Sequence, residues 1–143
     1  MTMKTISKSV WAWLIAAPVL IAAMPAEAVA AGDKTWSLAE LKARGANVYR
    51  KNCVACHQAN GQGIPSVFPA LDGSKVVTGP KAEHIKTVLD GRPGTGMLPF
   101  AARMSDADMA AVITYERNAW GNQTGEAVQP AEVKSARKSG LTP

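Results

Sequence analysis

The chain has 143 residues, enough for one modest domain, and its 16 Lys and Arg against 11 Asp and Glu give a net charge of +5. The basic residues are scattered and form no stripe with interleaved aromatic side chains, so the composition does not favour nucleic-acid binding. A domain of this size has a small hydrophobic core, and a large bound cofactor would stabilise it.

Residues 1–28 have the layout of a secretory signal peptide. Two lysines precede an uncharged apolar run over residues 10–24, and small residues at 26–28 provide the spacing that a signal peptidase recognises. The run is shorter than the roughly 20 residues that cross a bilayer. We therefore expect cleavage after Ala28 or Ala30, export to the periplasm and no stable membrane insertion. An uncleaved membrane anchor is the alternative hypothesis.

The rest of the chain is expected to be all-helical. It divides into a linker over residues 29–36, a domain over residues 37–121 and a polar tail over residues 122–143. A short helix over residues 130–138 is a further expectation within that tail. The sequence contains no internal repeat, low-complexity segment or extended period-two pattern, so nothing indicates a sheet.

The first predicted helix begins at a capping box. Ser37 and Glu40 have the required spacing, and the helix is expected to run to about Asn52. Small and apolar residues recur along it at helical spacing, which predicts one buried face. These residues are Leu38, Leu41, Gly45, Val48 and Tyr49.

Two further helices are predicted, each preceded by a long loop. One lies between Pro80 and Gly91, because proline favours the first turn of a helix and glycine follows its last. The other begins at Ser105 and runs to about Trp120. Glycine and proline break up residues 57–79 and the segment after Gly91. Loops this long are uncommon in a compact domain unless they have a function.

The pentapeptide CVACH, residues 53–57, contains both cysteines of the chain. In an exported protein, C-x-x-C-H is the attachment motif for c-type haem. Two thiols on one helical turn can reach both vinyl groups at one porphyrin edge and form thioethers. His57 directly follows and can bind the iron through one imidazole nitrogen.

Other interpretations of this motif have less support. A disulfide between Cys53 and Cys56 would close a very small loop and contribute little stability. A thioredoxin-type redox pair needs a βαβ context, which the sequence lacks. A structural zinc site needs four ligands, and beyond the motif only His84 remains.

A haem iron also needs a second axial ligand or an open position. Met97 is the favoured ligand, because it lies in a glycine- and proline-rich loop that can approach a flat group closely. Met109 lies inside the third predicted helix, where a core role is expected, and Met104 directly precedes that helix. His84 is an alternative ligand, although a surface position beside Glu83 is the simpler expectation. An open sixth position is the remaining alternative.

The chain resembles class I cytochromes c in four separate segments: GANVYRKNCVACH, GQGIPSVFPALDGS, GMLPF and MAAVITYERNAWGN. It is most similar to the cytochrome c domain at the C-terminus of some cytochrome c oxidase subunit II chains, over about residues 38–137. This resemblance implies an all-α class I cytochrome c fold. Three to four helices and long loops would wrap around one covalently bound haem c with its iron.

The resemblance also implies roles for individual residues. Two cysteines would carry the thioethers, one histidine and one methionine would ligate the iron, a proline carbonyl would accept a hydrogen bond from that histidine, and a leucine would pack on the haem face. In that order these residues are Cys53, Cys56, His57, Met97, Pro69 and Leu71. Gly45 and Tyr49 would cross the last helix of the domain at Tyr115.

These features predict an electron carrier rather than an enzyme. Its partners would be redox proteins such as a terminal oxidase or a dehydrogenase, steered by lysines near the exposed haem edge; Lys51, Lys75 and Lys81 are candidates. A peroxidase or a gas-binding haem is the second hypothesis, should the sixth position be open. The third is a subunit that docks on a dehydrogenase or oxidase through Trp120 and the polar tail.

Overall fold

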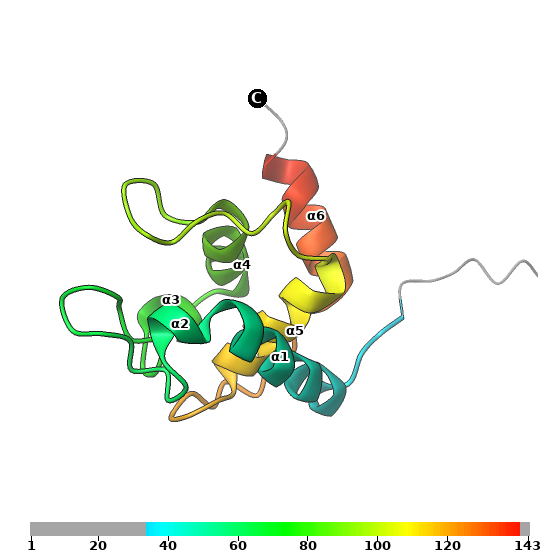
Figure 1. Ribbon diagram of the computed structural model, residues 1–143. Helices are drawn as coiled ribbons and strands as arrows, with labels where there is room; N and C mark the ends of the chain where they lie inside the picture. The colour runs from blue at the N-terminus through cyan, green and yellow to red at the C-terminus, as the bar shows by residue number, and fades with distance from the viewer. Residues whose placement is uncertain (1–33, 141–143) are drawn as a thin grey trace, which may run out of the picture. The chain divides into compact units, whose positions relative to one another are not determined.

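The computed structural model describes residues 34–140, which belong to one compact unit and are all-helical (Figure 1). The signal-peptide prediction falls outside these residues. In chain order the helices are α1 (Leu38–Asn52), α2 (Val54–His57), α3 (Lys75–Thr78), α4 (Lys81–Asp90), α5 (Asp106–Arg117) and α6 (Pro130–Gly140). The part of the chain described contains no strand, only an isolated antiparallel bridge between Ile64 and Phe68. The all-α prediction is confirmed.

The capping box predicted at the start of α1 is present. The Ser37 side chain accepts a hydrogen bond from the Glu40 backbone, and the Glu40 carboxylate accepts one from the Ser37 backbone. The hydrogen bonds that the Glu40 carboxylate accepts from the backbone and the hydroxyl of Ser37 lower its pKa from 4.5 to about 2, the backbone N–H contributing most. The helix ends at Asn52 as predicted, and Cys53 is its C-terminal cap.

Helices α1 and α5 pack closely across each other at Gly45. A β-carbon at that position would lie 2.1 Å from the carbonyl oxygen of Ala111 and 2.6 Å from the Cβ of Tyr115. The aromatic rings of Tyr49, Tyr115 and Trp120 cluster beside this crossing, with centroids 5.2 to 5.7 Å apart. Trp120 also donates a hydrogen bond to the Ala59 carbonyl, which connects this aromatic cluster to the loop after α2.

Helix α5 begins at the predicted cap, where Ser105 accepts a hydrogen bond from the Asp108 backbone. It ends at Arg117, three residues before the predicted end at Trp120. The reason is Asn118, whose side-chain amide donates to the carbonyl of Thr114 in the same helix and to that of Glu126 farther along the chain. These bonds turn the chain away from the helix axis.

The segment after residue 121, expected to be a polar tail, contributes to the hydrophobic core. Val128 and Val133 are fully buried in the cluster formed mainly by α1, α4 and α5. Lys81 on α4 forms an ion pair with Glu132 on α6, with 2.7 Å between nitrogen and oxygen. Helix α6 thus closes the side of the domain formed by α4 and α5.

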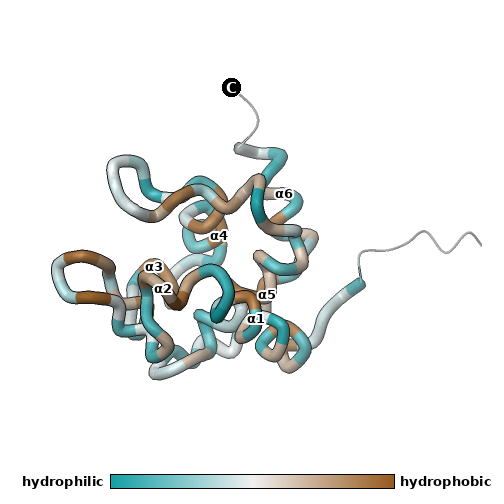
Figure 2. Tube along the Cα trace, in the orientation of Figure 1, coloured by the Kyte–Doolittle hydropathy of each residue, from teal (hydrophilic) through white to brown (hydrophobic). Residues whose placement is uncertain are grey.

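Two long connections, between α2 and α3 and between α4 and α5, project on the same side in Figure 1. Both contain hydrophobic stretches (Figure 2). Residues on both connections line one cavity, described below. Within residues 34–140, no helix is both long enough and apolar enough to cross a membrane.

Replacing Gly45 with alanine tests the close helix crossing. The new methyl group would overlap the Ala111 carbonyl, so we expect the free energy of unfolding to fall by about 3 kcal/mol. Chemical denaturation followed by circular dichroism measures this. Gly140→Ala is the control, because nothing lies within 4 Å of its added carbon, and it should unfold like the parent. Equal stability of the two variants would contradict the close contact between α1 and α5 at Gly45.

Candidate functional site

The candidate site is a predominantly apolar cavity of about 560 Å³, within the size range of cofactor pockets. Its walls come from the last residue of α1, from α2, α3 and α4, from both long connections and from one residue of α5. All six residues predicted to bind a cofactor line it: Cys53, Cys56, His57, Pro69, Leu71 and Met97. The fold therefore brings together residues that are up to 44 positions apart in the sequence.

The motif forms a single helical turn at the end of α1. Cys53 caps α1 and begins α2, and His57 is the last residue of α2. Both cysteines are half-buried, and no disulfide joins them. Burial raises the pKa of the Cys53 thiol, and the Glu116 carboxylate raises it further. The two sulfurs thus stand on one short segment at the cavity wall, as two thioethers to one porphyrin require.

The imidazole of His57 is held by the first connection. Its Nδ1 lies 3.0 Å from the carbonyl oxygen of Pro69, and the ring is buried. Because Nδ1 donates to that carbonyl, Nε2 keeps its lone pair for a metal ion. Gly63 allows this arrangement, because its backbone has φ of +63° and approaches the carbonyls of Phe68 and Pro69 closely.

Met97 reaches the cavity from the second connection. Its carbonyl accepts a hydrogen bond from the backbone of Arg92 (2.8 Å), and its own N–H donates to the Thr95 hydroxyl (3.1 Å). The other two methionines considered above are buried members of the hydrophobic core: Met109 is fully buried, and Met104 packs between α5 and the end of α1. Met104 also lines the cavity, but it is buried in the core, whereas Met97 is half-buried in the glycine- and proline-rich part of the second connection.

The expectation of a surface position for His84 is wrong. The residue is 2% exposed, lines the cavity, and places its Nε2 2.9 Å from a carboxylate oxygen of Glu116 on α5. Sequence analysis missed Glu116 altogether. A signal for His84 did exist, since it precedes the buried Val88 by four residues and therefore shares the apolar face of α4.

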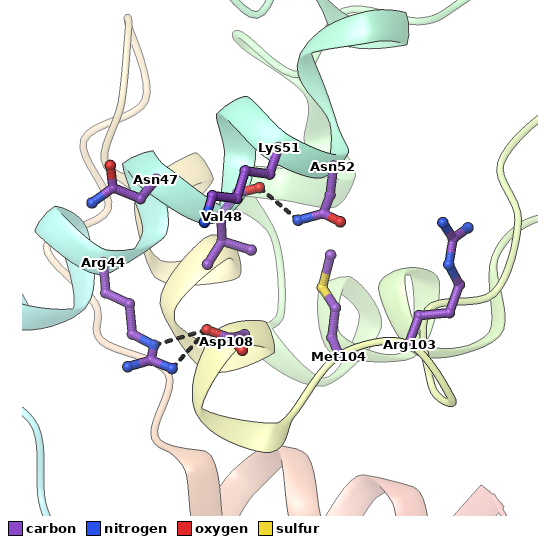
Figure 3. Close-up of a pocket in the computed structure, with 8 residues that line it drawn as sticks. All are labelled: Arg44, Asn47, Val48, Lys51, Asn52, Arg103, Met104 and Asp108. Carbon is purple, nitrogen blue, oxygen red and sulfur yellow. Dashed lines mark hydrogen bonds and ion pairs between the residues drawn. The ribbon is translucent and has the colours of Figure 1, made fainter.

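A second, smaller cavity of about 320 Å³ adjoins the first and carries positive charge (Figure 3). Lys51 and Arg103 line it together with Arg44, whose guanidinium is paired with Asp108 at 2.7 Å. Arg103 also lines the larger cavity, so a basic surface lies beside the candidate site. Of the lysines considered above, Lys51 lies in this surface, whereas Lys81 is paired with α6.

The residues around the larger cavity fit one covalently bound haem c. Two thiols on one turn, an imidazole with one nitrogen held by a carbonyl and the other left for a metal, and a thioether from a separate loop form a chemically suitable donor set. The walls are apolar, as a porphyrin face requires. Fold and donor set together define a c-type cytochrome.

Comparison with known proteins agrees with this class. Residues 39–115 match the sequence model of the family described as "Cytochrome C oxidase, cbb3-type, subunit III". The chain belongs to this cytochrome c family, whose members carry covalently bound haem c with its iron. Since the sequence contains a single C-x-x-C-H motif, the chain is a monohaem c-type cytochrome.

Several curated relatives are similar to the chain. A cytochrome c-552 of Thermus thermophilus is 34% identical over 74% of this chain and 82% of its own length. The cytochrome c subunit of alcohol dehydrogenase (quinone) from Gluconobacter oxydans is 30% identical over 67% of this chain. The cbb3-type cytochrome c oxidase subunit CcoP of Azospirillum brasilense is 31% identical over 68%. The chain spans only 22% of the Gluconobacter subunit and 35% of CcoP.

Gly63→Ala tests the support of His57. A β-carbon at Gly63 would lie 2.3 Å from the Phe68 carbonyl oxygen and 2.6 Å from that of Pro69. We expect the free energy of unfolding to be about 3 kcal/mol lower than in Gly73→Ala, because overpacking a close contact costs about that much. The melting temperature of the purified holoprotein should fall by roughly 10 °C more than that of the control.

Gly73 is a matched control because its φ is +70° and nothing lies within 4 Å of an added β-carbon. Both variants therefore carry similar backbone strain, but only one displaces the carbonyl that holds His57. Similar melting temperatures for the two variants would show that a side chain at residue 63 does not displace the Pro69 carbonyl.

Proposed function

We propose that the protein is an exported single-electron carrier whose haem iron is bound by His57 and Met97. The observation that carries the proposal is the convergence of Cys53, Cys56, His57 and Met97 on one apolar cavity. When bound, haem c supplies reversible one-electron chemistry at its iron. The task of the polypeptide is to bind, orient and shield that group.

Each residue around the cavity has one part in this task. Cys53 and Cys56 would form the thioethers, and His57 would offer Nε2 to the iron while the Pro69 carbonyl fixes its ring. Met97 offers its thioether, a ligand that raises the reduction potential and suits electron transfer. With both ligands supplied by the protein, the iron would keep the same donors in both oxidation states.

The mouth of the cavity is suited to a brief contact with another redox protein. Val67 and Leu98, one from each long connection, line the cavity and are 65% and 59% exposed. Lys51 and Arg103 lie in the adjoining basic cavity. An apolar rim beside positive charge favours an acidic partner, attracted at long range and held over a small area.

The partner we propose is a respiratory dehydrogenase or a terminal oxidase. The relatives named above include a cytochrome c subunit of a dehydrogenase and a subunit of a cbb3-type oxidase. The sequence of residues 1–28 supports export to the periplasm as the compartment.

Met97→Ala tests the proposed ligand. In oxidised protein the sulfur-to-iron charge-transfer band should disappear, and the reduction potential should fall because the thioether is lost. Met104→Leu is the control, since it replaces a buried core methionine on the wall of both cavities, and it should keep the band. Optical spectra and a redox titration measure both variants.

Retention of the band in Met97→Ala, or its loss in Met104→Leu, would refute the assignment of Met97. Carbon monoxide separates the carrier from a gas-binding or peroxidase haem. Reduced wild-type protein should be inert at neutral pH, whereas reduced Met97→Ala should bind the gas. Rapid binding by the wild type would contradict the proposal of an electron carrier.

A further inference from the structure

A buried hydrogen-bonded pair of ionisable side chains forms part of the cavity wall. Nε2 of His84 on α4 lies 2.9 Å from Oε2 of Glu116 on α5, and the two side chains are 3% and 6% exposed. Both residues line the larger cavity. The pair joins two helices across the hydrophobic core, and the roles proposed so far for the haem-binding residues do not use it.

The pair lies next to the segment that carries the cofactor. Glu116 lies close enough to Cys53 for its negative charge to raise the pKa of that thiol before haem is attached. Among the described residues that line this cavity, Glu116 is the only acidic one. A change of charge on the pair is therefore felt at the haem, with little intervening solvent to screen it.

Two basic residues near the pair along α4 and α5 form their ion pairs with other carboxylates. Arg117, the next residue on α5, bonds the Val77 carbonyl and Glu126. Lys81 is paired with Glu132 on α6. The other titratable or charged residues that line the cavity are Cys53, Cys56, His57, Arg92 and Arg103. Tyr49 on α1 interacts with Glu116 through charge.

One atom of the pair has no partner. Nδ1 of His84 is buried and makes no hydrogen bond within residues 34–140. With Nε2–H donating to Glu116, Nδ1 carries the free lone pair and is the atom that can accept a proton. Without the extra proton the pair is net negative, because His84 is neutral and Glu116 is ionised. When Nδ1 accepts a proton, the pair becomes net neutral.

We propose that His84 and Glu116 form a proton-binding site whose occupancy is coupled to the oxidation state of the haem. The inference rests on the function proposed above. On reduction the protein receives one electron from its donor protein, and the pair receives a proton from water at Nδ1 of His84. On oxidation both leave, the electron to the acceptor and the proton to water. No other bond forms or breaks.

The direction of the coupling follows from charge. An added electron makes the haem more negative, so the pair binds a proton more tightly in the reduced protein than in the oxidised protein. Because the two side chains share a hydrogen bond, the proton is assigned to the pair rather than to one residue. The reduction potential should fall with rising pH between the apparent pKa of the pair in the oxidised protein and its higher apparent pKa in the reduced protein. Below and above this range the potential should be constant.

The test is a series of redox titrations of the purified holoprotein from about pH 5 to about pH 9, the range in which a histidine can change charge. We expect proton dissociation constants that differ on the order of tenfold between the two oxidation states, which corresponds to a total fall of about 59 mV for one electron. The double variant His84→Leu with Glu116→Leu should remove the fall while keeping the cavity wall filled and apolar.

Glu126→Gln is the matched control, because Glu126 is a half-exposed carboxylate bound to Arg117 on α5 and does not line the cavity. It should keep the wild-type dependence on pH. A flat wild-type potential overturns the inference, and so does a fall that persists in the double variant. In either case a normal haem spectrum and a reversible one-electron couple would leave the proposed carrier function intact.

A second measurement on wild-type protein is independent of any variant. The chain has two histidines, and the proposed ligand His57 is not expected to titrate, so NMR can follow His84 alone. Its apparent pKa should be higher in reduced than in oxidised protein. Equal values in the two states would overturn the inference. Absence of a reversible couple would instead refute the proposed function itself.

Discussion

The covalently bound haem c is the constraint on which the rest of this structure depends. Two long connections, between α2 and α3 and between α4 and α5, contain little regular structure, yet both line the same apolar cavity. A porphyrin in contact with both would bury apolar surface worth about 25 cal/mol per Å². Such a group would add buried apolar surface to a small domain whose own side chains form only a modest hydrophobic core. The α1–α5 crossing at Gly45 provides the frame that positions the attachment segment against this cavity.

Much of the fold and of the candidate site could be predicted from the sequence, because the relevant interactions are local. The capping interactions at Ser37 and Ser105 join residues three positions apart, and the turn over residues 53–57 carries its chemistry within five residues. The loop of Met97 is marked by its own glycines and prolines. The resemblance to cytochromes c added the link between His57 and Pro69, which no local pattern contains.

Contacts between distant segments explain what could not be predicted. The early end of α5 depends on a bond from Asn118 to the carbonyl of Glu126, and the burial of Val133 depends on α6 packing against α5. The pair of His84 and Glu116 joins residues 32 positions apart. Helical spacing places His84 on the apolar face of α4, but only packing brings a carboxylate to it. A buried polar pair costs free energy to desolvate, and a role in tuning the haem gives a reason for its presence in an apolar wall.

Covalent attachment of the pigment is the central claim, and extraction of denatured protein with acidified acetone tests it most directly. The colour should stay with the polypeptide, and the mass of the extracted polypeptide should exceed that of the processed chain by one haem. In the double variant Cys53→Ala with Cys56→Ala, any pigment should pass into the organic phase. A wild-type polypeptide that comes out colourless would contradict the account.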